Sequence, residues 1–142
     1  MEKQSQWASP TEIRDYGACP LVADMDAATN ANCNFRTALW TGKHLQITLM
    51  SIPAGGDIGV ENHPDTDQFI RVESGCGLAL TGCSCSRLDQ CQHIDSRSAV
   101  VIPAGTWHNI VNIGSCPLKL YSVYAPPHHP FGTVHRTKAD AI

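Results

Sequence analysis

Two strand-like stretches of the chain carry imidazole, carboxylate and amide groups at spacings that suit metal binding. In the first, Glu61 and His63 are separated by one residue in an extended segment, so both side chains point to the same face of a strand. A Pro-Asp-Thr-Asp turn follows, and Gln68 then opens the run QFIRV. A hairpin at this turn would bring Gln68 beside Glu61 and His63. We predict that these three groups hold a divalent metal together with His108, which lies in the second stretch, PAGTWHNIVN.

Short strands separated by glycine and proline turns are predicted to position these groups. The alternation in KHLQITLMSI indicates a strand over 43–52, with Leu45, Ile47 and Leu49 on one phase and a polar phase from His44 to Met50. We expect the polar phase to be exposed; the alternative is that its His44 end faces the cavity. Further strands are predicted over 58–63, 68–72, 75–80, 91–94, 99–102, 107–112 and 118–124. About eight short strands with little helix between them predict an all-β sandwich or barrel.

The 142 residues are most simply one domain spanning 1–142, with a barrel core over about 43–125. Residues 1–38 are predicted to form an irregular N-terminal arm, with at most a short helix near 24–30. The C-terminal tail, 126–142, begins with APPHHPFG, and its prolines oppose regular strand pairing. We expect this tail to be a strap over the barrel or a partner subunit; the alternative is a lid that brings His128 and His129 to the cavity.

Composition excludes several classes of partner. The formal charge is −3 and only 16% of residues are charged, so no electrostatic footprint for nucleic acid is expected. The longest apolar runs, such as AVVI, are too short for a membrane helix, and the first 17 residues lack the apolar core of a secretory signal. We therefore expect a cytoplasmic protein.

Seven cysteines are numerous for such a compartment. Their odd count opposes a complete disulfide framework, so free thiols are expected. One local group, Cys83, Cys85, Cys91 and His93, could bind a soft metal, but its spacing matches no common zinc pattern. The other interpretation is a hairpin loop that happens to carry thiols.

The two stretches resemble the paired motifs of the cupin superfamily. The first follows G-x5-H-x-H-x4-E-x6-G from Gly55 to Gly75, and the second follows G-x5-P-x-G-x2-H-x3-N up to Asn112. Three positions depart from the pattern: Glu61 replaces the first motif's initial His, Gln68 replaces its Glu, and Arg97 replaces the second motif's leading Gly. The resemblance implies a double-stranded β-helix, a jelly-roll-like barrel, with a metal inside.

The ligand set that the resemblance implies is Glu61, His63, Gln68 and His108. One carboxylate with a divalent ion leaves a net charge of about +1, and the mixed N/O donors suit Zn²⁺, Mn²⁺, Fe²⁺ or Ni²⁺ without selecting one. Five further residues are predicted around the cavity or the ligands, namely His44, Gln46, Tyr121, His128 and His129.

The chain is most similar to small bacterial cupins described as mannose-6-phosphate-isomerase-like, which implies a sugar or sugar-phosphate isomerase. That chemistry needs a base, for which Glu61, Tyr121, Tyr124 and a tail histidine are candidates, and a phosphate-binding cation. The cation candidates are Arg36, Lys43, Arg71 and Arg136, although Arg71 is out of phase with Gln68.

Two alternatives stay open: a non-catalytic cupin that binds a small ligand or metal, and a metal-dependent dioxygenase. Cupins commonly pair through their outer sheets, so a homodimer is expected.

Overall fold

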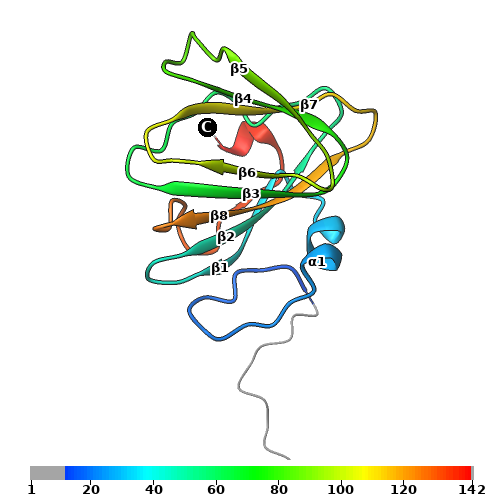
Figure 1. Cartoon of the computed structure of the whole chain (residues 1–142). Coiled ribbons are helices and arrows are strands. Elements are labelled where there is room, and N and C mark those ends of the chain that lie inside the picture. Colours follow the sequence, from blue (N-terminus) through cyan, green and yellow to red (C-terminus); the bar gives the residue numbers. More distant parts are fainter. Residues whose placement is uncertain (1–11, 142) are drawn as a thin grey trace, which may run out of the picture.

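Two antiparallel sheets face each other in the computed structural model, which describes residues 12–141 (Figure 1). The first 11 residues of the predicted arm lie outside the described part of the chain. The larger sheet has the order β6-β3-β8-β2-β1-β9 and the smaller has the order β5-β4-β7. The elements are α1 (Met25–Ala31), β1 (Arg36–Thr41), β2 (Gln46–Ile52), β3 (Asp67–Ser74), β4 (Gly77–Gly82), β5 (Gln90–Ile94), β6 (Ala99–Ile102), β7 (Trp107–Asn112), β8 (Leu118–Ala125), β9 (Val134–His135) and the 3₁₀ helix η1 (Lys138–Ala141). This arrangement confirms the predicted all-β barrel with one short helix.

The segment between β2 and β3 runs along the free edge of β7. Antiparallel bridges join Asp57 to Val111 and Glu61 to His108. A continuous strand was predicted over 58–63, but Gly59 has a φ of 92°, outside the extended region, so only isolated bridges form. The bridge at Glu61 nonetheless places the first stretch directly beside the second.

The space between the sheets is filled mainly by aliphatic side chains. β2, β3 and β8 each turn alternate residues inward, because side chains on a strand alternate between its faces. The buried cluster comprises Phe35, Met50, Ile52, Ile58, Ile70, Val72, Ala79, Ile94, Ile102, Ile110, Leu118 and Leu120. None of the described helices is long and apolar enough to cross a membrane.

The phase expected for β2 is wrong. Gln46, Thr48 and Met50 are buried, with exposed fractions of 0–2%, and Met50 belongs to the interior cluster. Leu49 is also fully buried but lies on the opposite phase, where the N-terminal arm covers the outer face of the sheet. The arm is tied to β1, since the Trp40 indole N–H donates to the Cys19 carbonyl at 2.7 Å. Because both faces of β2 are covered, alternation along the strand did not reveal which face is interior.

The arm and tail contain more regular structure than predicted. β1 begins at Arg36, within the stretch expected to be irregular, and α1 agrees with the short helix expected near 24–30. In the tail, β9 pairs with β1 through Arg36–His135 and Thr37–Val134. The prolines at 126, 127 and 130 precede β9, so they do not interrupt its pairing.

Candidate metal centre

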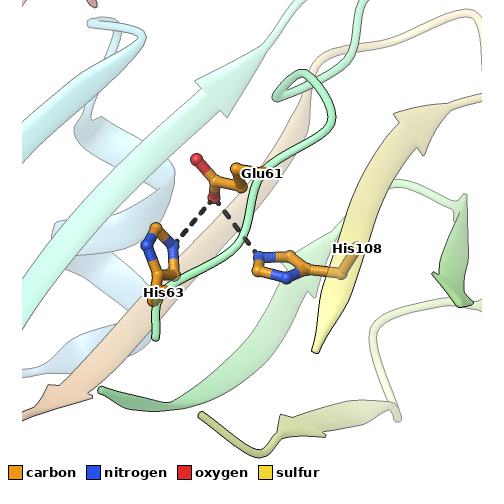
Figure 2. A group of neighbouring side chains, drawn as sticks. All are labelled: Glu61, His63 and His108. Carbon is orange, nitrogen blue, oxygen red and sulfur yellow. Dashed lines mark hydrogen bonds and ion pairs between the residues drawn. The ribbon is translucent and has the colours of Figure 1, made fainter. Parts of the chain in front are cut away.

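Glu61, His63 and His108 converge between the two sheets (Figure 2). Glu61 Oε1 lies 3.2 Å from His63 Nε2 and 3.4 Å from His108 Nε2, and one possible ligand atom from each residue lies within 4.8 Å of the others. His63 and His108 are buried, whereas about a quarter of the Glu61 side chain is exposed. Among residues 12–141, this is the only such group of three or more His, Cys, Asp or Glu side chains.

The backbone orients the His108 ring. His108 Nδ1 lies 2.9 Å from the Thr106 carbonyl oxygen, which can only accept, so Nδ1 carries the proton. Nε2 is then a lone pair that faces the Glu61 carboxylate, and within residues 12–141 it has no hydrogen-bond donor. Two facing acceptors so close together are unfavourable, and either a cation beside them or a proton on one of them would relieve this. A backbone carbonyl that fixes the imidazole tautomer in this way is the usual support for a metal-binding histidine.

The Glu61 carboxylate is held in its ionised form. Burial alone would raise its pKa, but the neighbouring His108 and His63 rings outweigh burial and hold the pKa well below its usual range. An ionised carboxylate beside two imidazole nitrogens is a donor set that suits a divalent transition metal. The residues present therefore fit the metal that the sequence motifs imply.

Gln68 lies at the start of β3 with its side chain buried. Its amide Nε2 donates to Ser122 Oγ at 3.2 Å, and its Oε1 is buried without a donor from the described residues. Gln68 is paired in register with Tyr124 of β8, whose ring lies 5.7 Å, centroid to centroid, from the His63 ring. The predicted fourth ligand thus lies in the polar interior near the triad, with one free acceptor.

The tail brings two histidines to this region. The His128 ring lies 4.0 Å from the His63 ring, and the His129 ring lies 5.2 Å from the Tyr124 ring. Gln46 holds this segment, since its Oε1 accepts from the backbone N–H groups of His128 and His129 at 3.1 and 2.8 Å and its Nε2 donates to the His129 carbonyl at 2.8 Å. Gln46 therefore anchors the tail, and its amide groups are fully used.

His44 and Tyr121 do not join the cluster. His44 lies exposed in the turn before β2, because the strand begins only at Gln46. Tyr121 is on the outward phase of β8, whereas Tyr124, three residues later, is buried and faces the interior. Burial raises the Tyr124 pKa to about 12, so its phenol is neutral at physiological pH. Alternation along β8 from Leu118 and Leu120 is the signal that could have selected Tyr124.

The thiol group near the β4–β5 hairpin does not assemble a site. Cys83, Cys85, Cys91 and His93 are all exposed, and they form no ligand cluster in the described chain. Cys83 and Cys85 lie in the turn, and Cys91 and His93 follow on β5. All seven cysteines are free, as predicted, and the hairpin-loop interpretation holds for this group.

Known proteins share both this sequence and this fold. A family model described as a cupin domain matches residues 48–124. The chain is 57% identical over 130 residues to YrkC, an uncharacterized protein of Bacillus subtilis (strain 168), covering 92% of this chain and 70% of YrkC. It is 40% identical over 114 residues to the uncharacterized protein L612 of Acanthamoeba polyphaga mimivirus, covering 80% of this chain and 69% of L612.

Solved structures with the same fold superpose on this chain. The crystal structure of BH2720 from Bacillus halodurans superposes with a TM-score of 0.89 at 54% identity, covering 91% of this chain and 98% of that one. A Klebsiella pneumoniae protein with a double-stranded β-helix domain superposes with a TM-score of 0.59 at 20% identity over 70% of this chain and 82% of its own, which is a likeness of fold alone. The chain belongs to the cupin family.

Proposed function

We propose that this cupin binds one divalent metal ion through Glu61, His63 and His108, and that the remaining coordination positions take a small oxygen-donor ligand. The observation that carries the proposal is the lone pair of His108 Nε2, which faces an ionised carboxylate 3.4 Å away without a donor from the described chain. A metal ion would satisfy both acceptors at once. The Thr106 carbonyl fixes the donor geometry before the ion arrives.

Gln68 is the best fourth group. Its Oε1 is buried and free to accept, whereas its Nε2 is used by Ser122. A neutral amide oxygen is a weaker ligand than a carboxylate, so Gln68 would contact the ion or a metal-bound water without adding charge.

The residues around the triad suit a small polar ligand. Tyr124 offers a neutral phenol, since its pKa is raised to about 12 by burial. His128 stands against His63, and its pKa is lowered by desolvation, so its imidazole is neutral near pH 7 and can accept a proton. A bound metal would supply Lewis acidity, and these side chains would orient the ligand beside it.

Two histidines and one carboxylate are the donor set typical of non-haem iron oxygenases, which favours the predicted dioxygenase among the catalytic alternatives. The predicted sugar-phosphate isomerase, and with it the mannose-6-phosphate-isomerase-like subgroup, has less support. Arg36 is buried and contacts His135 Nδ1 at 3.1 Å, and Arg71 donates to the backbone carbonyls of Val72 and Ser96. Both guanidinium groups therefore already have partners, although Arg36 Nε is buried without one in the described chain. A non-catalytic metal-binding or ligand-binding cupin is the remaining alternative.

The test is metal binding by protein first stripped with a chelator. Calorimetric titration with Fe²⁺ under anaerobic conditions, and with Mn²⁺, Ni²⁺ and Zn²⁺, should give one site per chain, and His108→Ala should remove it. His44→Gln, a change of an exposed histidine, is the matched control and should bind as the wild type does. The absence of a stoichiometric site for all four ions would refute the metal centre.

Light scattering on the same samples tests the predicted homodimer, which a monomer at micromolar concentration would contradict.

A further inference from the structure

We propose that a second ligand site, separate from the metal centre, binds a small organic anion with a compact apolar body. The site is a cavity of about 500 Å³ to whose wall the tail contributes. Its walls come from the segment before β1, the end of β2 with the loop after it, the start of β8, and the residues between β9 and η1. Such a volume is within the usual range for small-molecule sites.

The inner surface of this cavity is largely apolar. Phe35, which is 3% exposed and belongs to the interior cluster, contributes an aromatic ring. Pro53 and Pro117 contribute further carbon surface from the loops after β2 and before β8. A ligand that filled this space would therefore bury an apolar body of modest size.

The rim is cationic. Lys119, Arg136 and Lys138 line the cavity, and Asp57 is the only carboxylate among the described lining residues, so the lining carries a net charge of +2 in a chain whose formal charge is −3. Lys138 is paired with Asp57, which also accepts from Asn109 at 2.9 Å. That ion pair accounts for the single negative charge.

The other two cations have no ion-pair partner among residues 12–141. Lys119 donates to the backbone carbonyl of Asn32, a neutral acceptor. The Arg136 carbonyl accepts from the Phe35 N–H at 3.1 Å, which fixes its backbone beside the apolar wall. Within residues 12–141, neither Lys119 nor Arg136 has a carboxylate within ion-pair distance. An arginine and a lysine beside an apolar cavity provide charge-assisted hydrogen bonds for a carboxylate, sulfonate or phosphate group.

The cavity is distant from the triad. Ser51, in its wall, is paired in register with Lys119, whereas Tyr124, near the triad, is paired with Gln46 and Gln68. Lys119 and Tyr124 are five residues apart on β8, which at about 3.4 Å per residue places their backbone positions about 17 Å apart. Anion binding should therefore not require the metal ligands.

The proposal can be tested with 8-anilinonaphthalene-1-sulfonate, an apolar aromatic anion, titrated into the full chain and followed by amide chemical shifts. We expect saturable shifts at the amides of Phe35, Gly56 and Lys138. Arg136→Gln should weaken binding about threefold and Arg136→Glu tenfold or more. Both changes are at an exposed side chain, so folding should be retained, and thermal melting checks this.

Three controls test whether the anion occupies this cavity. Arg97→Glu makes the same charge change at an exposed arginine elsewhere and should leave the affinity unchanged. Glu61→Gln should also leave it unchanged, which distinguishes failure of the metal centre from failure of this site. The Trp40 indole resonance reports on a different apolar pocket beneath the arm, of about 380 Å³. Shifts confined to Trp40, or an equal affinity for Arg136→Glu and Arg97→Glu, would overturn the proposal.

Discussion

The two ends of the barrel interior have opposite chemistry although the same strands form them. In register across β2, β8 and β3, the row Gln46–Tyr124–Gln68 is followed by Thr48–Ser122–Ile70 and then by Met50–Leu120–Val72. The first row is polar, the second is mixed and the third is entirely apolar. All of these side chains are buried. One barrel therefore contains a polar layer beside the triad and an apolar layer beyond it.

Several buried polar atoms at the polar end lack a partner. Gln68 Oε1, Thr48 Oγ1, His63 Nδ1 and His108 Nε2 are all buried without a partner in the described chain, as are Thr29 Oγ1, Arg36 Nε and Asn109 Oδ1 elsewhere. A buried group of this kind costs about 1–3 kcal/mol, so it is retained only where it has a use. The apolar end stabilises the fold, and the polar end carries the candidate function at some expense of stability.

The largest change in the free energy of unfolding is expected at the apolar end. Leu120→Ala removes a side chain that is 1% exposed and belongs to the interior cluster. The lost burial and the residual cavity should lower the free energy of unfolding by about 2–5 kcal/mol. Urea unfolding of metal-free protein measures this change. The metal affinity of the folded fraction should stay as in the wild type, and a parallel loss of affinity would show that the apolar layer also supports the metal centre.

Glu61→Gln should reduce metal affinity strongly and the free energy of unfolding only slightly. It removes the only carboxylate of the triad while keeping its shape, so metal affinity should fall at least about a hundredfold, equivalent to about 2.7 kcal/mol. The free energy of unfolding without metal should fall by only about 1–2 kcal/mol, because the contacts of the ionised carboxylate with the two imidazoles are lost but a polar group of the same shape remains.

Calorimetry and urea unfolding on the same preparation give both values for Glu61→Gln. Glu73→Gln, at a half-buried glutamate outside the triad, is the matched control and should change neither value. An unchanged metal affinity in Glu61→Gln would remove the carboxylate from the centre.

Local signals explain which parts of this fold were predictable. β6 (Ala99–Ile102) and β7 (Trp107–Asn112) have the predicted bounds, because the Pro-Ala-Gly turn between them and the Asp-Ser-Arg turn before them end each run sharply. β1 was missed, since its first four residues are buried on both faces and show no alternation. For the same reason the interior phase of β2 was assigned to the wrong residues.

The candidate site also has parts that local sequence signals predict and parts that they do not. The convergence of Glu61, His63 and His108 follows from two local motifs that the antiparallel bridge at Glu61 and His108 brings together. The role of Gln46 does not follow from a local motif, because its partners at His128 and His129 are more than 80 residues away in sequence. A long-range hydrogen bond from a buried amide to a proline-rich tail leaves no periodic signal in either segment.

The tail should make the polar end sensitive to acid. Desolvation, with a smaller contribution from the Arg36 charge, lowers the His129 pKa from 6.5 to about 3. The unfolded chain therefore takes up this proton first as pH falls, so the stabilisation is complete above about pH 6.5 and is lost as pH falls toward 3. Because the tail can release locally, we expect a loss of about 1–2 kcal/mol rather than the full shift.

The measurement is the free energy of unfolding between about pH 7 and pH 4 for the wild type and His129→Gln, in metal-free protein. The variant should lose less stability over this range, because only the imidazole is removed and other titrating groups are shared. Leu120→Ala should keep the wild-type slope. Parallel curves for the wild type and His129→Gln would contradict a buried neutral imidazole at this end.

The smallest effect is expected for Gln68→Met, which keeps the length of the side chain but removes its amide. Loss of the hydrogen bond to Ser122 is offset by loss of the unpartnered Oε1, so the free energy of unfolding should stay within about 1 kcal/mol of the wild type. Metal affinity should fall by up to about tenfold, as expected for a neutral group that supports the ion. Gln92→Met, on the exposed face of β5, is the control. A metal affinity equal to that of the wild type would show that Gln68 only fills the interior. A hundredfold loss would make its amide as important as the Glu61 carboxylate. This variant therefore decides whether the site, with Glu61 and Gln68 at the motif's His and Glu positions, has three ligands or four.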